Sequence, residues 1–348
     1  MIDRATLESL QWLKRELDGV HNITRQDRMN YSAAVTQALQ RLTDVPPLNF
    51  VVSIPYWGPW HAHTCATVTI PSVLAAINYA KAENRVRFIM HTISPDVTKG
   101  LLKGFQVEYL PLPAHPDEWM RFSMGHKETL FKAKDRECIC LLCADNLVSR
   151  ELFTFTEWAV ASSYKAIAAL GPRVTANPVT VPLGAEASQL AKWAMTNAHP
   201  WTKSLYYKTG NSNSPSVIYF HDAQGISGHG FHLHPVMVLK DRYLNFKGGA
   251  IDADLLNCFS KEDIYVVAYN EIFMCDVTQP ERKHGTAGPL DDEAIIQWAK
   301  NPVSVLPLHR WNFKHRITFT GNGANSQSIV NSILQQLENQ DGDRPSST

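Results

Sequence analysis

The sequence predicts an α/β fold, with an open, mostly parallel (mixed) sheet flanked by helices and a helical appendage at the N-terminus. Apolar runs of strand length, such as "LNFVVSIPYWG" at 48–58, alternate with segments of helical periodicity, a pattern typical of parallel sheets with crossover helices. Hydrophobic residues make up 44% and charged residues 19% of the 348 residues, which is ordinary for a folded globular chain.

At the N-terminus, apolar residues recur at three and four spacing from Ala5 to about Leu42. This spacing predicts two amphipathic helices, which end before "DVPP". We expect three regions: a helical appendage at 1–45, a catalytic domain at 46–320, and a C-terminal helix with a disordered tail at 321–348.

Four buried strands are expected in the first half of the domain. Helices are expected between them at 69–84 and 125–137. The four strand sequences are "LNFVVSIPYWG", "RVRFIMHT", "FQVEYLPL" and "CICLLCADNLVS".

The second half is less regular. We expect a long helix at 150–170, a helix at 184–198, strands at 216–222, 231–239 and 263–277, and a helix at 326–339. The alternating order of the whole domain favours ligand binding at the carboxyl ends of the parallel strands.

The charge balance excludes some partners. Thirty-three basic residues balance thirty-three acidic ones, so no bulk field attracts nucleic acid, and we expect none as a partner. No run approaches the ~20 apolar residues that span a bilayer, so we expect no transmembrane segment. The N-terminus also lacks the apolar region of a signal peptide, which favours a cytoplasmic protein.

Six cysteines are scattered and mostly embedded in apolar strands, which indicates buried thiols in a reducing compartment. In "CICLLC", Cys138 and Cys140 alternate along a strand while Cys143 falls on the other face. This arrangement favours core thiols over a zinc site.

Asp145 follows the fourth buried strand and is itself followed by the polar Asn146. An open sheet presents a carboxylate to a divalent cation in this way. A turn or capping role for Asp145 is equally consistent with the sequence.

The order of these segments resembles a GT-A-type, nucleotide-sugar-dependent glycosyltransferase, in particular a poorly characterised bacterial glycosyltransferase-like family. The matching landmarks span roughly residues 48 to 280: "VVSIPYWG", "IPSVLAAINYA", "RFIMHT", "CADNLVS", "GFHLHP" and "GGAIDADL". The resemblance implies a GT-A-like sheet, a nucleotide-sugar donor, and an acceptor that is a saccharide, a lipid-linked molecule or another small molecule. It also implies transfer in glycoconjugate biosynthesis, assisted by Mn²⁺ or Mg²⁺.

By this resemblance the donor is held at the ends of the first strands. Pro55, Tyr56 and Trp57 would contact the base, with Thr92 nearby, although ordinary packing also explains the aromatic residues. The ribose or diphosphate would meet Lys127, Lys132 and Asn146, although the lysines also suit a solvated helix face.

One departure concerns the metal. The family's Asp-x-Asp motif would need an acid at Cys143, and only Asp145 is present. Because a hard cation usually takes about six oxygen ligands, we expect His234, or alternatively His232, to complete the site, unless the enzyme works without metal.

His232 and His234 stand at i, i+2 on an expected strand, so both imidazoles would face one way. Imidazole can bind a metal or act as acid or base near neutral pH, and we assign His232 a catalytic role. Two hydrogen-bonded polar residues at the start of a strand are the other interpretation.

Two further segments supply candidates. Asp252 and Asp254 of "GGAIDADLLN" could bind or deprotonate the acceptor, or Asp252 could cap the helix that follows. Near the C-terminus, "LHRWNFKHRI" contains His309, which by the resemblance would close over the donor phosphates; a basic surface stretch is the alternative.

Two other classes of function stay open. His61 and His63, with His232 and His234, could build a zinc or di-metal hydrolase. The missing acid at Cys143 also suits a carbohydrate-binding relative without catalysis.

Overall fold

A computed structural model provides the structure of this protein. It describes residues 47–112, 115, 117–175, 181–241, 244–246, 249–268, 271–282, 285–286, 288–301 and 305–342, without the side chains of 118, 119, 252, 253 and 340–342. The predicted appendage at 1–45 and the last six residues of the predicted tail lie outside the described residues.

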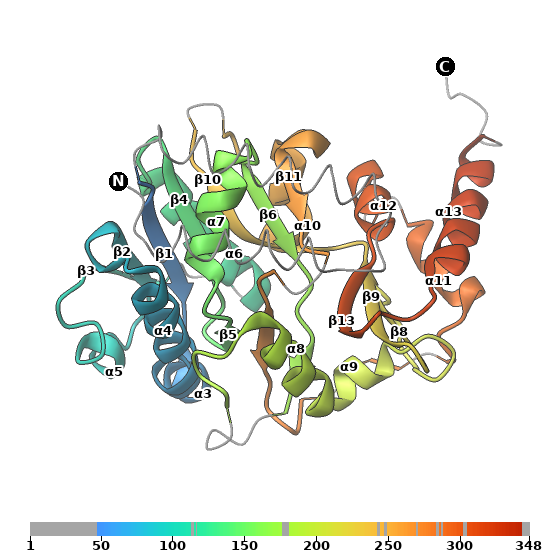
Figure 1. Ribbon diagram of the computed structural model, residues 1–348, viewed down its shortest axis with the longest axis horizontal. Helices are drawn as coiled ribbons and strands as arrows, with labels where there is room; N and C mark the ends of the chain where they lie inside the picture. Colours follow the sequence, from blue (N-terminus) through green and yellow to red (C-terminus); the bar gives the residue numbers. More distant parts are fainter. Residues whose placement is uncertain are drawn as a thin grey trace. The chain divides into compact units, whose positions relative to one another are not determined.

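The chain forms two compact units (Figure 1). Unit 1 takes in the described residues as far as Ile167 and the segment Pro235–Tyr265. Unit 2 takes in Ala168–His234 and the described residues from Val266 onward. The segment 46–320, predicted as one catalytic domain, is thus distributed over both units.

Unit 1 begins as a strand, helix, strand alternation. Its elements up to the last crossover are β1 Asn49–Pro55, α3 Gly58–Thr64, a π-helical turn Cys65–Thr69, α4 Ile70–Ala80, a 3₁₀ turn Glu83–Arg85, β2 Val86–His91, α5 Asp96–Lys99, β3 Gln106–Leu110, α6 Glu118–Lys132, β4 Glu137–Leu141, β5 Asn146–Val148 and α7 Leu152–Ala161. The returning segment adds β10 His234–Leu239, α10 Ile251–Asp254, and 3₁₀ turns at Leu255–Cys258 and Lys261–Asp263.

A seven-stranded sheet has the order β11-β6-β10-β4-β1-β2-β3, in which β6 spans Ala166–Ala169 and β11 spans Ile264–Val266. β1 pairs in parallel with both β2 and β4, and β2 pairs in parallel with β3. β10 runs antiparallel to β4. The prediction of a mixed, mostly parallel sheet flanked by helices is therefore confirmed.

Helices cover both faces of this sheet. α4 packs against α7, and α6 packs against β1, β4 and α10 (Figure 1). The strand order reverses between β1 and β4, because the chain moves from β1 outward to β3 and then returns through α6 to the other side of β1. In doubly wound sheets the ligand crevice lies at such a switch point, beyond the carboxyl ends of the strands.

Unit 2 contains smaller sheets. Its elements are β7 Arg173–Val174, α8 Ala187–Thr196, α9 Pro200–Ser204, β8 Val217–Asp222, β9 Gly225–Gly230, β12 Met274–Val277, α11 Asp292–Ala299, α12 Pro307–Phe313, β13 Ile317–Gly321 and α13 Gln327–Gly342. β8, β9 and β13 form an antiparallel sheet, and β12 pairs in parallel with β7. The core beside the antiparallel sheet gathers apolar residues of β8, α11, α12 and α13, including Phe220, Phe313 and Val330.

Several predicted elements need correction. The long helix expected at 150–170 ends at Ala161, and its second half contains the strand β6. The strand expected at 263–277 is two strands, β11 and β12. β9, in the glycine-rich "GISGHG", was not predicted. Among the residues that the structure describes, no helix is long and apolar enough to cross a membrane.

Candidate functional site

The carboxyl end of β1 leads directly into a long helix. α3, the π-helical turn and α4 are continuous, because the residues that join them, Cys65 and Ile70, have right-handed helical dihedrals. Pro59 occupies the first turn, where its missing N–H costs nothing. The positive end of this helix dipole therefore lies beside the β1/β4 switch point, an arrangement that favours anionic groups.

Trp57 stands at the start of this helix and is half-buried. The ring of His61 lies 4.9 Å from the ring of Trp57, and its Nδ1 lies 3.2 Å from the Trp57 carbonyl oxygen. The guanidinium carbon of Arg121, from the first turns of α6, lies 5.8 Å from the centroid of the Trp57 ring. Arg121 is oriented by donating from Nε and an Nη to the His115 carbonyl, at 3.3 and 2.7 Å.

The other predicted contacts at the end of β1 have different surroundings. Tyr56 is fully buried, and its hydroxyl donates to the Ser94 carbonyl at 3.0 Å. Burial raises the pKa of Tyr56, against the opposing effect of its Thr98 and Thr92 neighbours, so the phenol stays protonated. Thr92 is 5% exposed and accepts from the Ser94 N–H at 3.0 Å. The hydroxyls of Tyr56 and Thr92 are thus both used in internal hydrogen bonds with Ser94.

Asp145 lies in a turn four residues beyond the end of β4, so the strand expected to reach it is shorter than predicted. Asn146 closes this turn, since its Oδ1 accepts from the Cys143 N–H at 2.6 Å. The Thr69 hydroxyl, in the π-helical turn, donates to the Ala144 carbonyl at 2.7 Å. Asp145 is 8% exposed. The bonds of Asn146 within the turn and of Thr69 from the helix hold the backbone on both sides of it in place.

The thiol of Cys65 lies close to Asp145. Burial raises the pKa of Cys65, and the negative charge of Asp145 raises it further. The cysteine is therefore a neutral packing residue. None of the six cysteines, all of them among the described residues, forms a disulfide, and Cys65, Cys138, Cys140 and Cys275 are buried, as the sequence indicated.

The two predicted lysines of α6 lie away from the switch point. Gly125 marks the carboxyl edge, since a Cβ on it would lie 3.1 Å from Pro55 and 3.2 Å from His91, the last residues of β1 and β2. Lys127 lies beyond Gly125 and its Nζ is 6.0 Å from the Phe131 ring. Lys132 ends the helix and pairs with Glu108 of β3 at 2.7 Å.

A buried polar network lies just beneath the carboxyl edge. Ser53 Oγ is 2.8 Å from both His126 Nδ1 and Thr129 Oγ1, and His91 Nε2 is 3.0 Å from Thr129 Oγ1. All four side chains are fully buried. Glu128 lies 3.6 Å from His91 Nδ1, yet burial lowers the pKa of His91 to about 4, so His91 is neutral at pH 7.

His234 is the first residue of β10. In the antiparallel pairing, Met237 is opposite Cys140 and Leu239 is opposite Cys138. The start of β10 therefore lies toward the carboxyl end of β4, as the assignment of His234 requires. His232 precedes the strand, so the prediction that both histidines lie on one strand is wrong.

In unit 2, the structure brings His232 and His309 together. Their rings meet edge to face at 4.5 Å, and the ring of Trp298 lies 5.8 Å from His232. His309 Nδ1 accepts from the Leu306 N–H at 3.0 Å, so its Nε2 carries the proton. His232 is half-buried and His309 is 3% exposed.

The neighbouring His229 has a structural role. It is fully buried, with Nδ1 3.0 Å from the Phe313 carbonyl oxygen and Nε2 2.8 Å from the Ser326 hydroxyl. Burial lowers its pKa to about 4. Of the three histidines in "HGFHLH", His229 therefore belongs to the core.

Asp254 caps the helix that Asp252 was expected to cap. The N-cap residue is Ala250, and its N–H donates to Asp254 Oδ2 at 2.8 Å. The side chain of Asp252 lies outside the described atoms.

The described residues do not fit a metal ion held by the protein alone. Among them, no group of three or more His, Cys, Asp or Glu side chains is placed to hold one. The predicted site of Asp145 with His234 or His232 is therefore not formed by these residues alone. The same is true of the predicted hydrolase site of His61, His63, His232 and His234. His61 and His63 are also two residues apart on α3, a spacing at which helical side chains diverge.

Compared with known protein families and with curated proteins, the sequence matches none.

Proposed function

We propose that this protein is a glycosyltransferase of the GT-A type, which transfers a sugar from a nucleotide-sugar donor bound at the β1/β4 switch point of unit 1. The observation that carries the proposal is the contact of Arg121 with Trp57 at the start of one long helix at that point. Asp145 lies farther along the same helix, beside Cys65, in the turn after β4. Each of the three side chains supplies a different contact that such a donor needs.

The base would stack on Trp57. Base–aromatic stacking contributes about 1–3 kcal/mol per base, and the half-buried ring already has His61 and Arg121 beside it. The diphosphate would then lie toward the helix start and Arg121, because helix dipole and guanidinium both stabilise negative charge. Catalysis would rest on neutralising the leaving diphosphate.

Asp145 would accept hydrogen bonds from hydroxyls of the donor. Its fixed turn suits this role, because an oriented carboxylate loses little freedom on binding. Within unit 1, the candidates for removing the acceptor's proton are Asp252 and Asp254, of which Asp254 already accepts from the Ala250 N–H.

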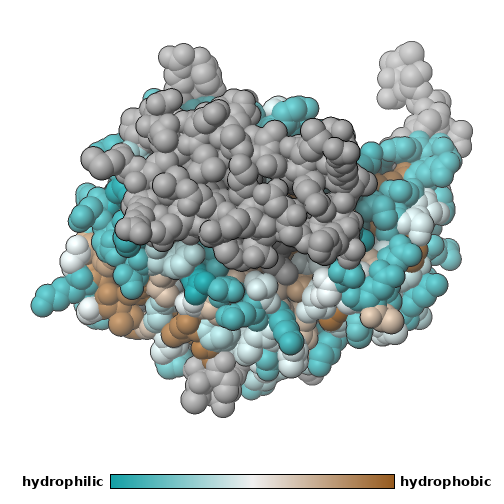
Figure 2. All heavy atoms as spheres, viewed as in Figure 1, coloured by the Kyte–Doolittle hydropathy of each residue, from teal (hydrophilic) through white to brown (hydrophobic). Residues whose placement is uncertain are grey.

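An apolar strip beside α5 favours an acceptor with an apolar part, such as a lipid-linked one. Ile93, Val97 and Leu101 are four residues apart and are 75%, 44% and 41% exposed. Figure 2 shows apolar surface over the region where Figure 1 draws α3, α4 and α5, with polar side chains around it. Tyr56, which precedes Trp57, hydrogen-bonds Ser94 within this segment.

The test is nucleotide binding measured by calorimetry. Wild-type protein is titrated with UDP, GDP, CDP and ADP, in EDTA and in Mn²⁺. We expect one nucleotide to bind, and Trp57→Ala to weaken it about tenfold, the equivalent of ~1.4 kcal/mol of stacking. Because the described residues hold no metal site of their own, measurable binding in EDTA is expected.

Trp311→Ala is the matched control. Trp311 is also half-buried, and its ring meets that of a histidine four residues later edge to face, with the rings 4.4 Å apart and His315 Nδ1 3.0 Å from the Trp311 carbonyl oxygen. Equal losses in both variants, or no binding to wild type, would contradict the proposal.

Transfer is tested by the release of nucleoside diphosphate from the matching nucleotide sugar. Asp145→Asn should abolish release with the fold retained, whereas Asp263→Asn, which alters an ion pair with Lys165, should not. Nucleotide binding without release from any nucleotide sugar would instead favour the carbohydrate-binding relative.

A further inference from the structure

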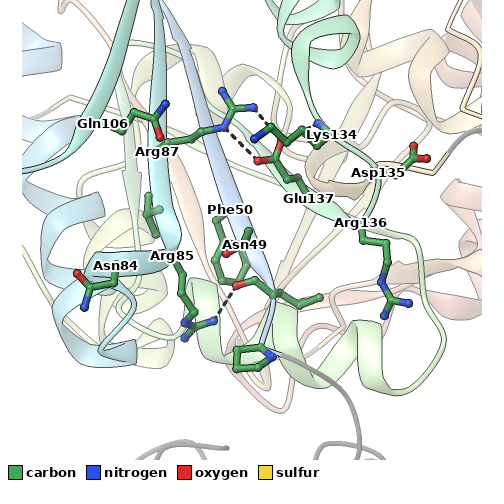
Figure 3. A pocket seen from close by; sticks show the side chains of 13 residues that line it. Asn49, Phe50, Asn84, Arg85, Arg87, Gln106, Lys134, Asp135, Arg136 and Glu137 are labelled. Atoms are coloured by element: carbon green, nitrogen blue, oxygen red, sulfur yellow. Dashed lines mark hydrogen bonds and ion pairs between the residues drawn. The ribbon is translucent and has the colours of Figure 1, made fainter.

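A pocket lies at the opposite edge of the sheet from the proposed donor site, where β1, β2 and β3 begin (Figure 3). It has a volume of about 470 Å³ and is lined by the first residues of β1, β2 and β3 and by the turn before β4. This volume falls in the range of small-molecule sites, roughly 300–1,000 Å³. Ligands of open α/β sheets normally bind at the carboxyl ends, so the proposed donor site does not account for this pocket.

Two arginines of the pocket are held rigidly. Arg87 donates from Nε and Nη2 to the two carboxylate oxygens of Glu137, at 3.1 and 2.8 Å, and Glu137 also accepts from the Lys134 N–H at 2.7 Å. Arg85 donates to the Leu48 carbonyl at 2.9 Å and pairs with Glu157. Figure 3 shows the bonds between Arg87 and Glu137 as dashed lines. The two guanidinium groups are therefore fixed in position, each paired with a carboxylate.

Two further cations lie on the turn before β4. Lys134 and Arg136 are exposed, and their side chains form no ion pair with another described residue that would neutralise them. Four cationic side chains line the pocket, but Arg87 is paired with Glu137 and Arg85 with Glu157, so Lys134 and Arg136 remain against the single carboxylate of Asp135. The pocket carries a positive excess although the whole chain has no net charge.

Arg136 occupies an unusual backbone position for an arginine. Its φ is +67°, in the left-handed region, where its N–H donates to the Lys240 carbonyl at 2.7 Å. A residue other than glycine costs roughly 1–2 kcal/mol in this region. Lys81 and Lys208 share this left-handed conformation, so it fixes the backbone at Arg136 but does not by itself mark a binding site.

We propose that this pocket binds a small molecule through a phosphate or pyrophosphate group. Lys134 and Arg136 would contact the group from the turn, and the fixed guanidinium groups of Arg85 and Arg87 would add N–H donors that their carboxylate partners leave unused. A multiply charged anion matches several cations better than a single carboxylate does. The amides of Asn49, Asn84 and Gln106, also in the lining, suit hydroxyls on the rest of the molecule.

The test is calorimetric titration with orthophosphate, pyrophosphate and glucose 1-phosphate, with the double variant Lys134→Gln/Arg136→Gln. We expect wild-type protein to bind at least one of them and the variant to bind it at least about tenfold more weakly. Preference for orthophosphate would identify free phosphate as the ligand, and preference for glucose 1-phosphate a phosphorylated metabolite.

The matched control is Lys81→Gln/Lys103→Gln. It removes the same charge from unit 1 outside the pocket, and Lys81 is likewise left-handed, with φ +50°. Equal weakening in this control would mean nonspecific attraction and would overturn the proposal, as would no binding to wild type at millimolar anion.

Trp57→Ala separates the two sites. Binding of the preferred anion should survive this change. Loss of binding would place the anion at the carboxyl edge and refute the second pocket while leaving the donor site intact.

Discussion

Ser53→Ala should destabilise the protein strongly, because Ser53 joins β1 to α6 under the proposed donor site. Its hydroxyl lies 2.8 Å from both His126 Nδ1 and Thr129 Oγ1, and all three residues are fully buried. Each buried group left without its partner costs about 1–3 kcal/mol. Thr129 keeps contacts with His91 Nε2 and the Gly125 carbonyl, so we expect a total loss of about 2–3 kcal/mol.

The assay is urea unfolding followed by circular dichroism. A lower midpoint with an unchanged slope would report a loss of stability rather than a change of the unfolded state. The double variant Ser53→Ala/Thr129→Val should lose about 1 kcal/mol less than the sum of the single losses, because the two side chains share one bond.

The exposed Ser214 provides the control for Ser53. Ser214→Ala should change stability by less than about 0.5 kcal/mol. A similarly small loss for Ser53→Ala, or strict additivity with Thr129→Val, would refute the idea that this network holds α6 against β1.

Two further predictions concern the fold. Gly225→Ala should cost ~3 kcal/mol or more, because φ is +146° and the new Cβ would lie 2.0 Å from the Thr320 carbonyl oxygen; Gly288→Ala, with φ +143° and open space, should show only the backbone strain, and equal Tm losses would disprove the clash. The neutral His91 and His229 have pKa values of about 4, below the unfolded value of ~6.5. Because the unfolded chain then binds protons that the folded one rejects, stability should be constant above pH 6.5 and fall by about 3 kcal/mol per histidine toward pH 4. Urea unfolding at several pH values measures this fall, and a His229→Asn variant whose stability falls with pH as steeply as that of wild type would contradict the prediction.

Apolar runs located the central strands well. β1, β2 and β4 are buried on both faces, so their sequences are nearly continuous in Val, Ile, Phe and Leu, and this signal does not depend on the rest of the fold. The turn with Asp145 could be placed at the carboxyl edge for the same reason. The distance of this turn from the end of β4 could not be predicted, because a bond that fixes the turn comes from Thr69, 75 residues away in the sequence.

The missed strands show what the sequence does not reveal. β9 contains Gly228 and Gly230, which are typical of a loop, yet Leu170 and Phe319 would lie 2.6 and 2.9 Å from a Cβ on Gly228. Glycine is used there because other side chains pack directly on the strand. β6 is rich in alanine, a helix former, and is a strand because its small side chains are buried within the sheet.

Arg121 was missed although the sequence contains a signal for it. A helix that follows a parallel strand starts at the carboxyl edge, so the first turns of α6 reach the ligand side and its last turn does not. That rule favours Arg121 over Lys127 and Lys132. The pairing of His232 with His309 had no such signal, since 76 residues separate them and only the packing of α12 brings them together.

The two proposed sites differ in how their charge is arranged, and the difference follows from the direction of the parallel strands. At the carboxyl edge, Arg121 lies beside the half-buried Trp57 at a helix start, and Asp145 is fixed in the turn after β4, which suits a ligand with a base, a diphosphate and hydroxyls. At the amino edge, four cations line a pocket without an exposed aromatic side chain among its described residues, which suits a smaller anion. β1 contributes to both edges, and its Ser53 anchors α6 between them. Variants at one edge should therefore leave ligand binding at the other unchanged as long as the Ser53 network is intact, whereas Ser53→Ala should weaken both.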